Sequence, residues 1–179
     1  MKKFMICFMA LFVFGWTQAQ EQEPVFGFKS GANFSNFSGD ADADMRTGYY
    51  FGFLADFSIS EKFHLQPEVL YSIEGGDGDV DLGINYIKVP VMAKYYVAEG
   101  FSLQAGPYLS VLTSTVESDF KDALKTLDYG LGFGLGYEFK NGLLIDGRFN
   151  LGLANIYDGE GAASVQNTAI QVGLGYRFF

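Results

Sequence analysis

The sequence has little cysteine, histidine or charge. Among its 179 residues there is one cysteine, Cys7, and one histidine, His64. These counts exclude a disulfide-stabilised scaffold and a zinc site built from cysteine and histidine ligands. Charged residues make up 18% of the chain, and the formal net charge of −9 leaves no general basic surface for a nucleic acid. We therefore expect no cofactor, no metal centre and no nucleic-acid partner.

Long apolar runs are also missing, apart from one at the start of the chain. Lys2 and Lys3 precede an apolar run, Phe4–Trp16, which is followed by small and polar residues up to Ala19. This layout predicts a secretory signal peptide. The alternative is an uncleaved membrane anchor, but the run is shorter than the ~20 residues that a spanning helix needs. We expect a signal peptide at residues 1–19 and one domain at residues 20–179. Cleavage would change the formal net charge to −11, because two lysines are lost.

Glycine and aromatic residues are abundant instead, with 23 Gly, 19 Phe and 11 Tyr. Such an aromatic content excludes a disordered chain. The apolar residues alternate with period two, which is the pattern of a β-strand. In Tyr129–Phe139 the odd positions are large and apolar, whereas the even positions are glycine, except for Glu138. A glycine-lined face predicts a narrow interior in which bulky side chains from other strands need the space. A helix would be disfavoured by about 1 kcal/mol for each glycine.

The alternation recurs in eight runs of about 9–13 residues, the length of a tilted strand that crosses a bilayer. The runs cover residues 26–34, 49–59, 63–74, 86–97, 101–111, 129–139, 143–154 and 170–178. We predict an all-β fold, an eight-stranded antiparallel up-and-down transmembrane β-barrel. Pro67 and Pro90 remove ladder donors from two strands and so predict bulges.

The predicted connections alternate in length. Three are short (60–62, 98–100 and 140–142) and four are longer and polar (36–46, 75–83, 113–128 and 155–166). This pattern is typical of an outer-membrane barrel, with both chain ends on the periplasmic rim of short turns. A lipocalin-like soluble barrel shares the strand count, but it would have an apolar inner face and a polar outer face.

The chain also resembles the PorT-like outer-membrane β-barrel proteins of the Bacteroidetes, an eight-stranded porin-family domain. The matching stretches are Phe26–Asn33, Ile87–Val91 with Lys94–Tyr96, Gln104–Tyr108, Asp128–Gly132 and Gly173–Phe178. The resemblance covers nearly all of the mature chain and implies fold and location, but little about activity. It also implies that the terminal aromatics Tyr176, Phe178 and Phe179 form the signal read by the barrel-insertion machinery, and the alternation places Phe178 toward lipid.

The inner face predicted by the alternation carries charged side chains. We expect a lumen network of Asp56, Glu68, Lys88, Lys94, Glu138, Asp146, Arg148 and Arg177, with His64 and Glu74 on the same face. An eight-stranded barrel is just wide enough for side chains to fill it, and buried charges must be paired. We interpret the set as a network that plugs the lumen. The alternative is a narrow polar conduit for ions or small solutes.

Two other features suggest chemistry. His64, Glu68 and Ser72 could form the triad of an outer-membrane lipid hydrolase, but strand positions i and i+4 lie about 13 Å apart. The acidic loop residues Asp40, Asp42, Asp44, Asp77, Asp79 and Asp81 are candidate contacts for divalent cations, with solvated loop tips as the simpler interpretation. Residues 116–127 have the spacing of a short helix.

Together these features predict an outer-membrane barrel without catalytic activity. We expect a structural or interaction protein of the cell envelope that acts through its outer loops or its periplasmic rim. The expected partners are outer-membrane lipid and lipopolysaccharide, the barrel-insertion machinery, and candidate envelope or secretion proteins.

Overall fold

The computed structural model describes residues 23–39, 44–77, 81–116, 124–158 and 164–178. The expected signal peptide at residues 1–19 lies outside this part of the chain, as do Asp40, Asp42, Asp79 and Phe179. In the described residues there is no helix with the length and apolar character needed to cross a membrane.

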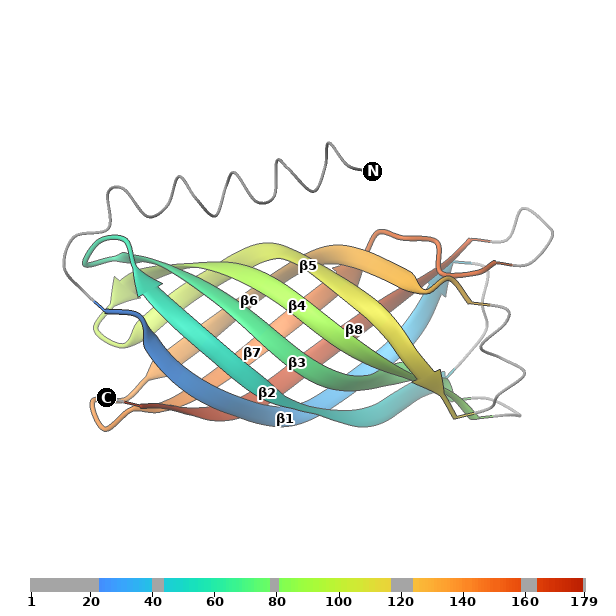
Figure 1. The fold of residues 1–179 in the computed structure, drawn as a ribbon, viewed down its shortest axis with the longest axis horizontal. Helices are drawn as coiled ribbons and strands as arrows, with labels where there is room; N and C mark the ends of the chain where they lie inside the picture. The colour runs from blue at the N-terminus through green and yellow to red at the C-terminus, as the bar shows by residue number, and fades with distance from the viewer. Residues whose placement is uncertain (1–22, 40–43, 78–80, 117–123, 159–163, 179) are drawn as a thin grey trace.

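The described residues form eight antiparallel β-strands that close into a barrel (Figure 1). The strands are β1 (Val25–Gly39), β2 (Asp44–Ser58), β3 (Phe63–Asp77), β4 (Asp81–Ala98), β5 (Phe101–Thr115), β6 (Leu127–Glu138), β7 (Leu143–Gly152) and β8 (Val165–Arg177). Each strand pairs with its neighbours in sequence, and β1 closes the ring by pairing with β8 from Gly27↔Arg177 to Gly39↔Val165. The predicted fold class is therefore confirmed.

The two rims of the barrel differ. Residues 59–62, 99–100 and 139–142 connect strands at one end, where the first strand begins and the last one ends (Figure 1). We call this end the turn rim and the opposite end the loop rim. Seven of the eight strands run further toward the loop rim than the sequence pattern predicted, whereas β7 ends at Gly152, two residues before its predicted end. Residues expected in loops, such as Asn36–Gly39 and Gly75–Asp77, are paired in the barrel wall instead.

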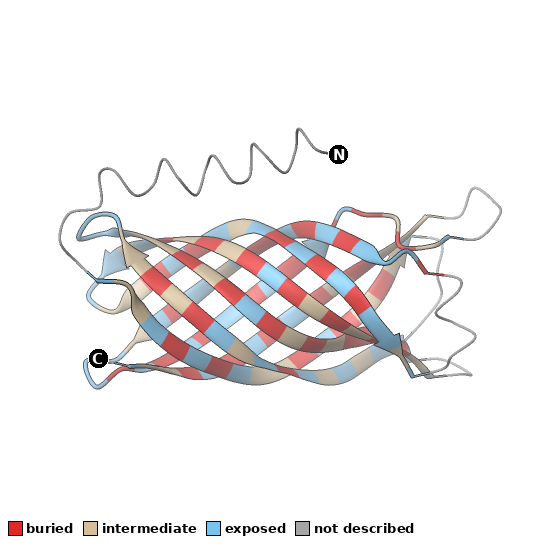
Figure 2. Ribbon diagram, in the orientation of Figure 1, coloured by how far each residue is buried: buried red, intermediate tan, exposed pale blue. Residues whose placement is uncertain are grey.

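Inward and outward positions alternate around the wall, which gives each strand the banded burial seen in Figure 2. The outward positions are large and apolar, for example Phe53, Leu135 and Leu174, all of which are more than half exposed. The inward positions carry buried polar and charged side chains. This arrangement is the inverse of a soluble barrel and matches a wall that faces hydrocarbon.

Inward glycines make room for a tyrosine that lies across the lumen wall. Tyr50 of β2 neighbours Gly31 of β1, which is paired with Gly173 of β8. A Cβ on Gly31 would come within 2.9 Å of the Tyr50 ring, and one on Gly173 would overlap its hydroxyl group. That hydroxyl donates a hydrogen bond of 3.3 Å to Asp146 of β7. The glycine-lined face of Tyr129–Phe139 accepts a bulky side chain as predicted at Gly130, where a Cβ would come within 2.6 Å of the Tyr108 hydroxyl oxygen.

One local expectation was wrong. The pairing register is continuous across Pro67 and Pro90, and the register shifts lie elsewhere, next to Met45, Asn85 and Tyr96. Each proline keeps a partner in the register, Pro67 with Val91 and Pro90 with Tyr108, so neither one forces an extra residue into its strand.

The expected helix over residues 116–127 lies largely outside the described residues, and its last four residues are not helical. Leu127 begins β6, and the buried Leu124 bridges to Tyr157. Leu124 therefore contacts the loop after β7, and residues 117–123 lie outside the described part.

Candidate functional site

The polar interior is organised as three ionic clusters that follow one another along the barrel. The turn-side cluster consists of Asp56, His64, Lys94, Glu138 and Arg177. Lys94 donates to Asp56 at 3.0 Å, to Gln66 at 3.0 Å and to Glu138. Arg177 pairs with the other oxygen of Glu138 at 2.8 Å. Because these side chains come from β2, β3, β4, β6 and β8, the cluster ties most of the ring together at this end.

The central cluster consists of Lys29, Glu68, Asp146 and Arg148, and it is fully enclosed. The Arg148 guanidinium donates two parallel hydrogen bonds to the Glu68 carboxylate, at 3.0 and 2.8 Å. Lys29 is paired with Asp146 and lies 3.6 Å from Glu68. Two positive and two negative charges therefore balance, and the bidentate geometry is the strong form of this ion pair.

The loop-side cluster consists of Glu74, Lys88 and Asp128. Glu74 accepts hydrogen bonds from Lys88 at 2.5 Å, from Ser72 at 2.7 Å and from Asn167 at 2.5 Å. Lys88 also lies over the Tyr108 ring, 4.5 Å from its centroid. Asp128 shares this region but has no ion pair with a described residue at hydrogen-bond distance.

An apolar seal closes the lumen beyond the loop-side cluster. Its members are buried side chains from the loop-rim ends of strands and from the two long loops: Phe37, Ile84, Tyr86, Leu112, Leu124, Ala154 and Ile156. The bridge between Leu124 and Tyr157 holds the two loops against each other. The described part of the loop rim thus carries a small hydrophobic core.

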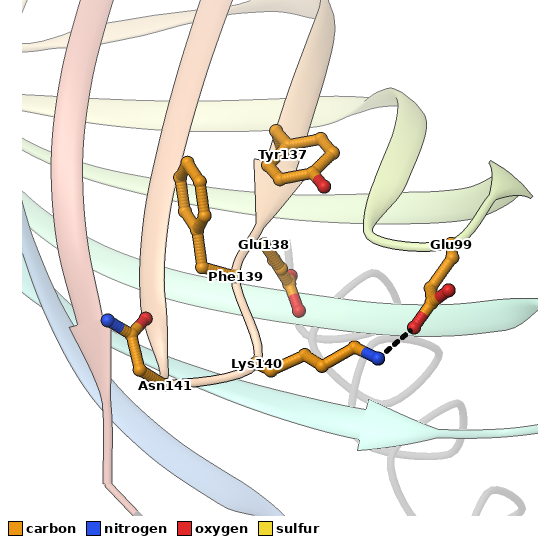
Figure 3. Close-up of a pocket in the computed structure, with 6 residues that line it drawn as sticks. All are labelled: Glu99, Tyr137, Glu138, Phe139, Lys140 and Asn141. Atoms are coloured by element: carbon orange, nitrogen blue, oxygen red, sulfur yellow. Dashed lines mark ion pairs between the residues drawn. The ribbon is translucent and has the colours of Figure 1, made fainter.

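The turn rim is more open and polar. A hollow of about 430 Å³ is lined there by Tyr137, Glu138, Phe139, Lys140 and Asn141 together with Glu99 (Figure 3). Lys140 and Glu99 form an exposed ion pair of 2.8 Å across it. The hydrogen bond and charge of Lys140 lower the pKa of the Glu99 carboxyl.

All eight side chains of the predicted lumen network lie inside the barrel, in these three clusters. Two members, Lys29 and Asp128, were missed. Lys29 shares its face with Gly27 and Asn33, so the alternation contained the necessary signal. Asp128 was assigned to a loop, although it continues the even-numbered inward face of Gly130 and Gly132.

The triad of His64, Glu68 and Ser72, which the strand spacing argued against, is not formed. Glu68 is held by Arg148, and Ser72 donates to Glu74. His64 lies instead between two residues of β2: its Nδ1 is 2.5 Å from Asp56, and its Nε2 is 3.0 Å from the Ser58 hydroxyl. The spacing along one strand gives no sign of this contact, because it joins residues of two neighbouring strands.

The remaining predicted residues lie at the two rims. At the loop rim, Asp44 and Asp77 face each other in the β2–β3 register, and Arg46 pairs with Asp77 at 2.9 Å. Within the described residues there is no group of three or more acidic, histidine or cysteine side chains suited to a metal ion. At the turn rim, Phe178 is exposed and its ring lies 6.0 Å from Phe28 and 6.2 Å from Tyr176.

The closed barrel, its apolar outer wall and its ionic interior are features of outer-membrane barrels, and the sequence agrees with them. The sequence pattern of the outer membrane protein beta-barrel domain matches residues 18–158. The chain belongs to this family. No curated protein sequence matches this chain.

Solved structures show the same fold. The attachment invasion locus protein Ail of Yersinia pestis is 18% identical, with a TM-score of 0.53 over 88% of this chain and 100% of Ail. Neisserial surface protein A is 11% identical, with a TM-score of 0.61 over 88% of this chain and 100% of its own. A de novo designed transmembrane β-barrel is 13% identical, with a TM-score of 0.50 over 89% of this chain and 100% of its own. At these identities the likeness concerns the fold alone.

Proposed function

We propose that this protein is an exported outer-membrane barrel with a closed lumen, which acts as a structural or interaction protein of the cell envelope through its outer loops or its turn rim. The observation that carries the proposal is the filled interior. Balanced ion pairs fill the lumen near the turn rim and at its centre. The apolar seal fills it between the loop-side cluster and the loop rim. Such a lumen leaves the two rims as the surfaces that are free to meet partners.

Several features support the rest of the assignment. The segment before Ala19 has the layout of a signal peptide, and the short-turn rim suits the periplasm. The PorT-like motifs favour that subgroup of the family. We propose outer-membrane lipid and lipopolysaccharide as surroundings, the barrel-insertion machinery as a transient partner, and envelope or secretion proteins as partners of the rims.

Conductance of the refolded mature chain in planar bilayers tests the closed lumen, after heat-dependent gel migration has shown that the barrel is folded. We expect no discrete openings, because ion pairs span the central lumen. The competing function is a narrow conduit, which the continuous polar lining favours. Openings that change in size with substitutions at Lys88, Arg148 or Glu138 would establish the conduit and overturn our proposal.

We also propose that catalysis plays no part in this function, although Ser58, His64 and Asp56 form a serine–histidine–aspartate contact. Asp56 is already paired with Lys94, and it lies 3.8 Å from Arg177. The neighbouring hollow of about 280 Å³ is lined by His64 but not by Ser58. A substrate bound there would meet the imidazole before the hydroxyl group.

A fluorophosphonate probe checks this point, because it labels serines that a histidine activates. We expect the folded barrel to show no more labelling than its Ser58→Ala variant. Labelling that maps to Ser58 and disappears in His64→Ala would instead demonstrate an activated nucleophile and a hydrolase.

A further inference from the structure

The three ionic clusters differ in their charge balance. The turn-side cluster pairs Asp56 and Glu138 with Lys94 and Arg177. In the central cluster, Lys29 and Arg148 balance Glu68 and Asp146 in the same way. The loop-side cluster sets two carboxylates, Glu74 and Asp128, against one ammonium group, that of Lys88. Among the described residues, this cluster alone carries one uncompensated negative charge.

Asp128 has an environment that a buried carboxylate rarely tolerates. Its side chain is completely buried, yet neither carboxylate oxygen has a hydrogen-bond partner among the described residues. On the loop side of the lumen, three further buried oxygens share this lack: the hydroxyl groups of Tyr108 and Ser110 and the amide oxygen of Asn167. An unpaired buried carboxylate costs several kcal/mol, so Asp128 must either hold a proton or lie next to a cation.

The strand register places three of these residues next to one another on the inner face. Ser110 of β5 stands between Lys88 of β4 and Asp128 of β6, as the direct cross-strand neighbour of both. Tyr108 lies over Gly130, where a Cβ would come within 2.6 Å of its hydroxyl oxygen. Gly130 is two residues after Asp128, so the hydroxyl group and the carboxylate share one inward face.

Asn167 reaches the same region from β8. Its amide nitrogen donates to Glu74, which also accepts from Lys88. Its amide oxygen is left without a partner among the described residues, and Glu74 connects it to the row of Lys88, Ser110 and Asp128.

We propose that the oxygens of Asp128, Ser110, Tyr108 and Asn167 form a site for one monovalent metal cation of the sodium or potassium class. Carboxylate, hydroxyl and amide oxygens are the ligands that such hard cations take. One positive charge restores the balance of the loop-side cluster. A divalent ion would leave an excess positive charge next to Lys88, and a water molecule would leave the negative charge uncompensated. The apolar seal encloses the site, so the bound ion stabilises the barrel and does not depend on whether the lumen conducts.

Unfolding by urea in phospholipid vesicles, followed by tyrosine fluorescence, tests the site with sodium ions as the probe. The mature chain is compared in sodium chloride and in N-methylglucamine chloride of equal ionic strength, because the bulky organic cation cannot enter. We expect sodium to raise the ratio of folded to unfolded protein about tenfold when it is present at roughly ten times its dissociation constant. The dependence should saturate with sodium concentration.

Three variants locate the effect. Asp128→Asn should abolish the sodium dependence, and Ser110→Ala should shift its midpoint to higher sodium concentration. Asp158→Asn removes an exposed carboxylate near the same rim and should leave the dependence unchanged. If wild-type stability is the same in both salts, Asp128 holds a proton or pairs with another group of the protein, and the proposal is wrong. It is equally wrong if Asp128→Asn retains the full sodium response.

Discussion

Replacing Arg148 with methionine should lower the free energy of unfolding by about 3–5 kcal/mol, the range for removing one partner of a buried ion pair. The Arg148 and Glu68 side chains are nearly inaccessible to solvent, and their two parallel hydrogen bonds are the best-formed contact of the central cluster. The variant leaves the Glu68 carboxylate with Lys29, 3.6 Å away, as its nearest cation. Urea unfolding of the refolded barrel in vesicles measures the change.

Two further variants show whether the loss comes from the unpaired charge. Lys140→Met breaks the exposed pair with Glu99 at the turn rim and should have no measurable effect on stability. The double variant Arg148→Met with Glu68→Leu removes both charges and should recover much of the lost stability, because apolar groups can replace a buried pair at little cost. If the Arg148 variant is as stable as the Lys140 variant, the central cluster does not hold the barrel together.

Introducing valine at Gly173 should have an effect of similar size, because its Cβ would overlap the Tyr50 hydroxyl and come within 2.9 Å of Asp146. The ring cannot turn away freely, since Tyr50 is buried. Overpacking of this kind costs about 1–3 kcal/mol, to which the loss of the hydrogen bond to Asp146 adds about 0.5–1.5 kcal/mol. Unfolding in vesicles and the fraction of heat-modifiable protein on gels report the loss.

Gly147 offers a matched control on the outer wall of β7. A Cβ built there meets no atom within 4 Å, so Gly147→Val should be neutral or slightly stabilising in lipid. Combining Gly173→Val with Tyr50→Ala should restore part of the stability, because the smaller side chain frees the space. A Gly173→Val barrel as stable as the Gly147→Val barrel would show that Tyr50 does not depend on the space next to Gly173.

The sequence by itself determined the barrel architecture and which side chains face the lumen or the outer wall. Side chains alternate between two faces along a strand, so the period of two assigned Lys88 and Arg148 to the lumen and Phe53 and Leu135 to the wall before any contact was known. The same rule identified the glycine-lined face. Strand ends were less certain, because the polar residues of Asn36–Gly39 resemble a loop although they pair with β8.

Only the tertiary structure decided which charges meet. Arg148 and Glu68 are 80 residues apart, and Lys29 and Asp146 are 117 residues apart. Their contact depends on ring closure and on the register of every strand between them, and the period of two contains no information about either. The contact of His64 with Ser58 and Asp56 likewise results from the pairing of β2 with β3. The excess negative charge at Asp128 likewise becomes visible only when the ion pairs of the other buried charges are known from the structure.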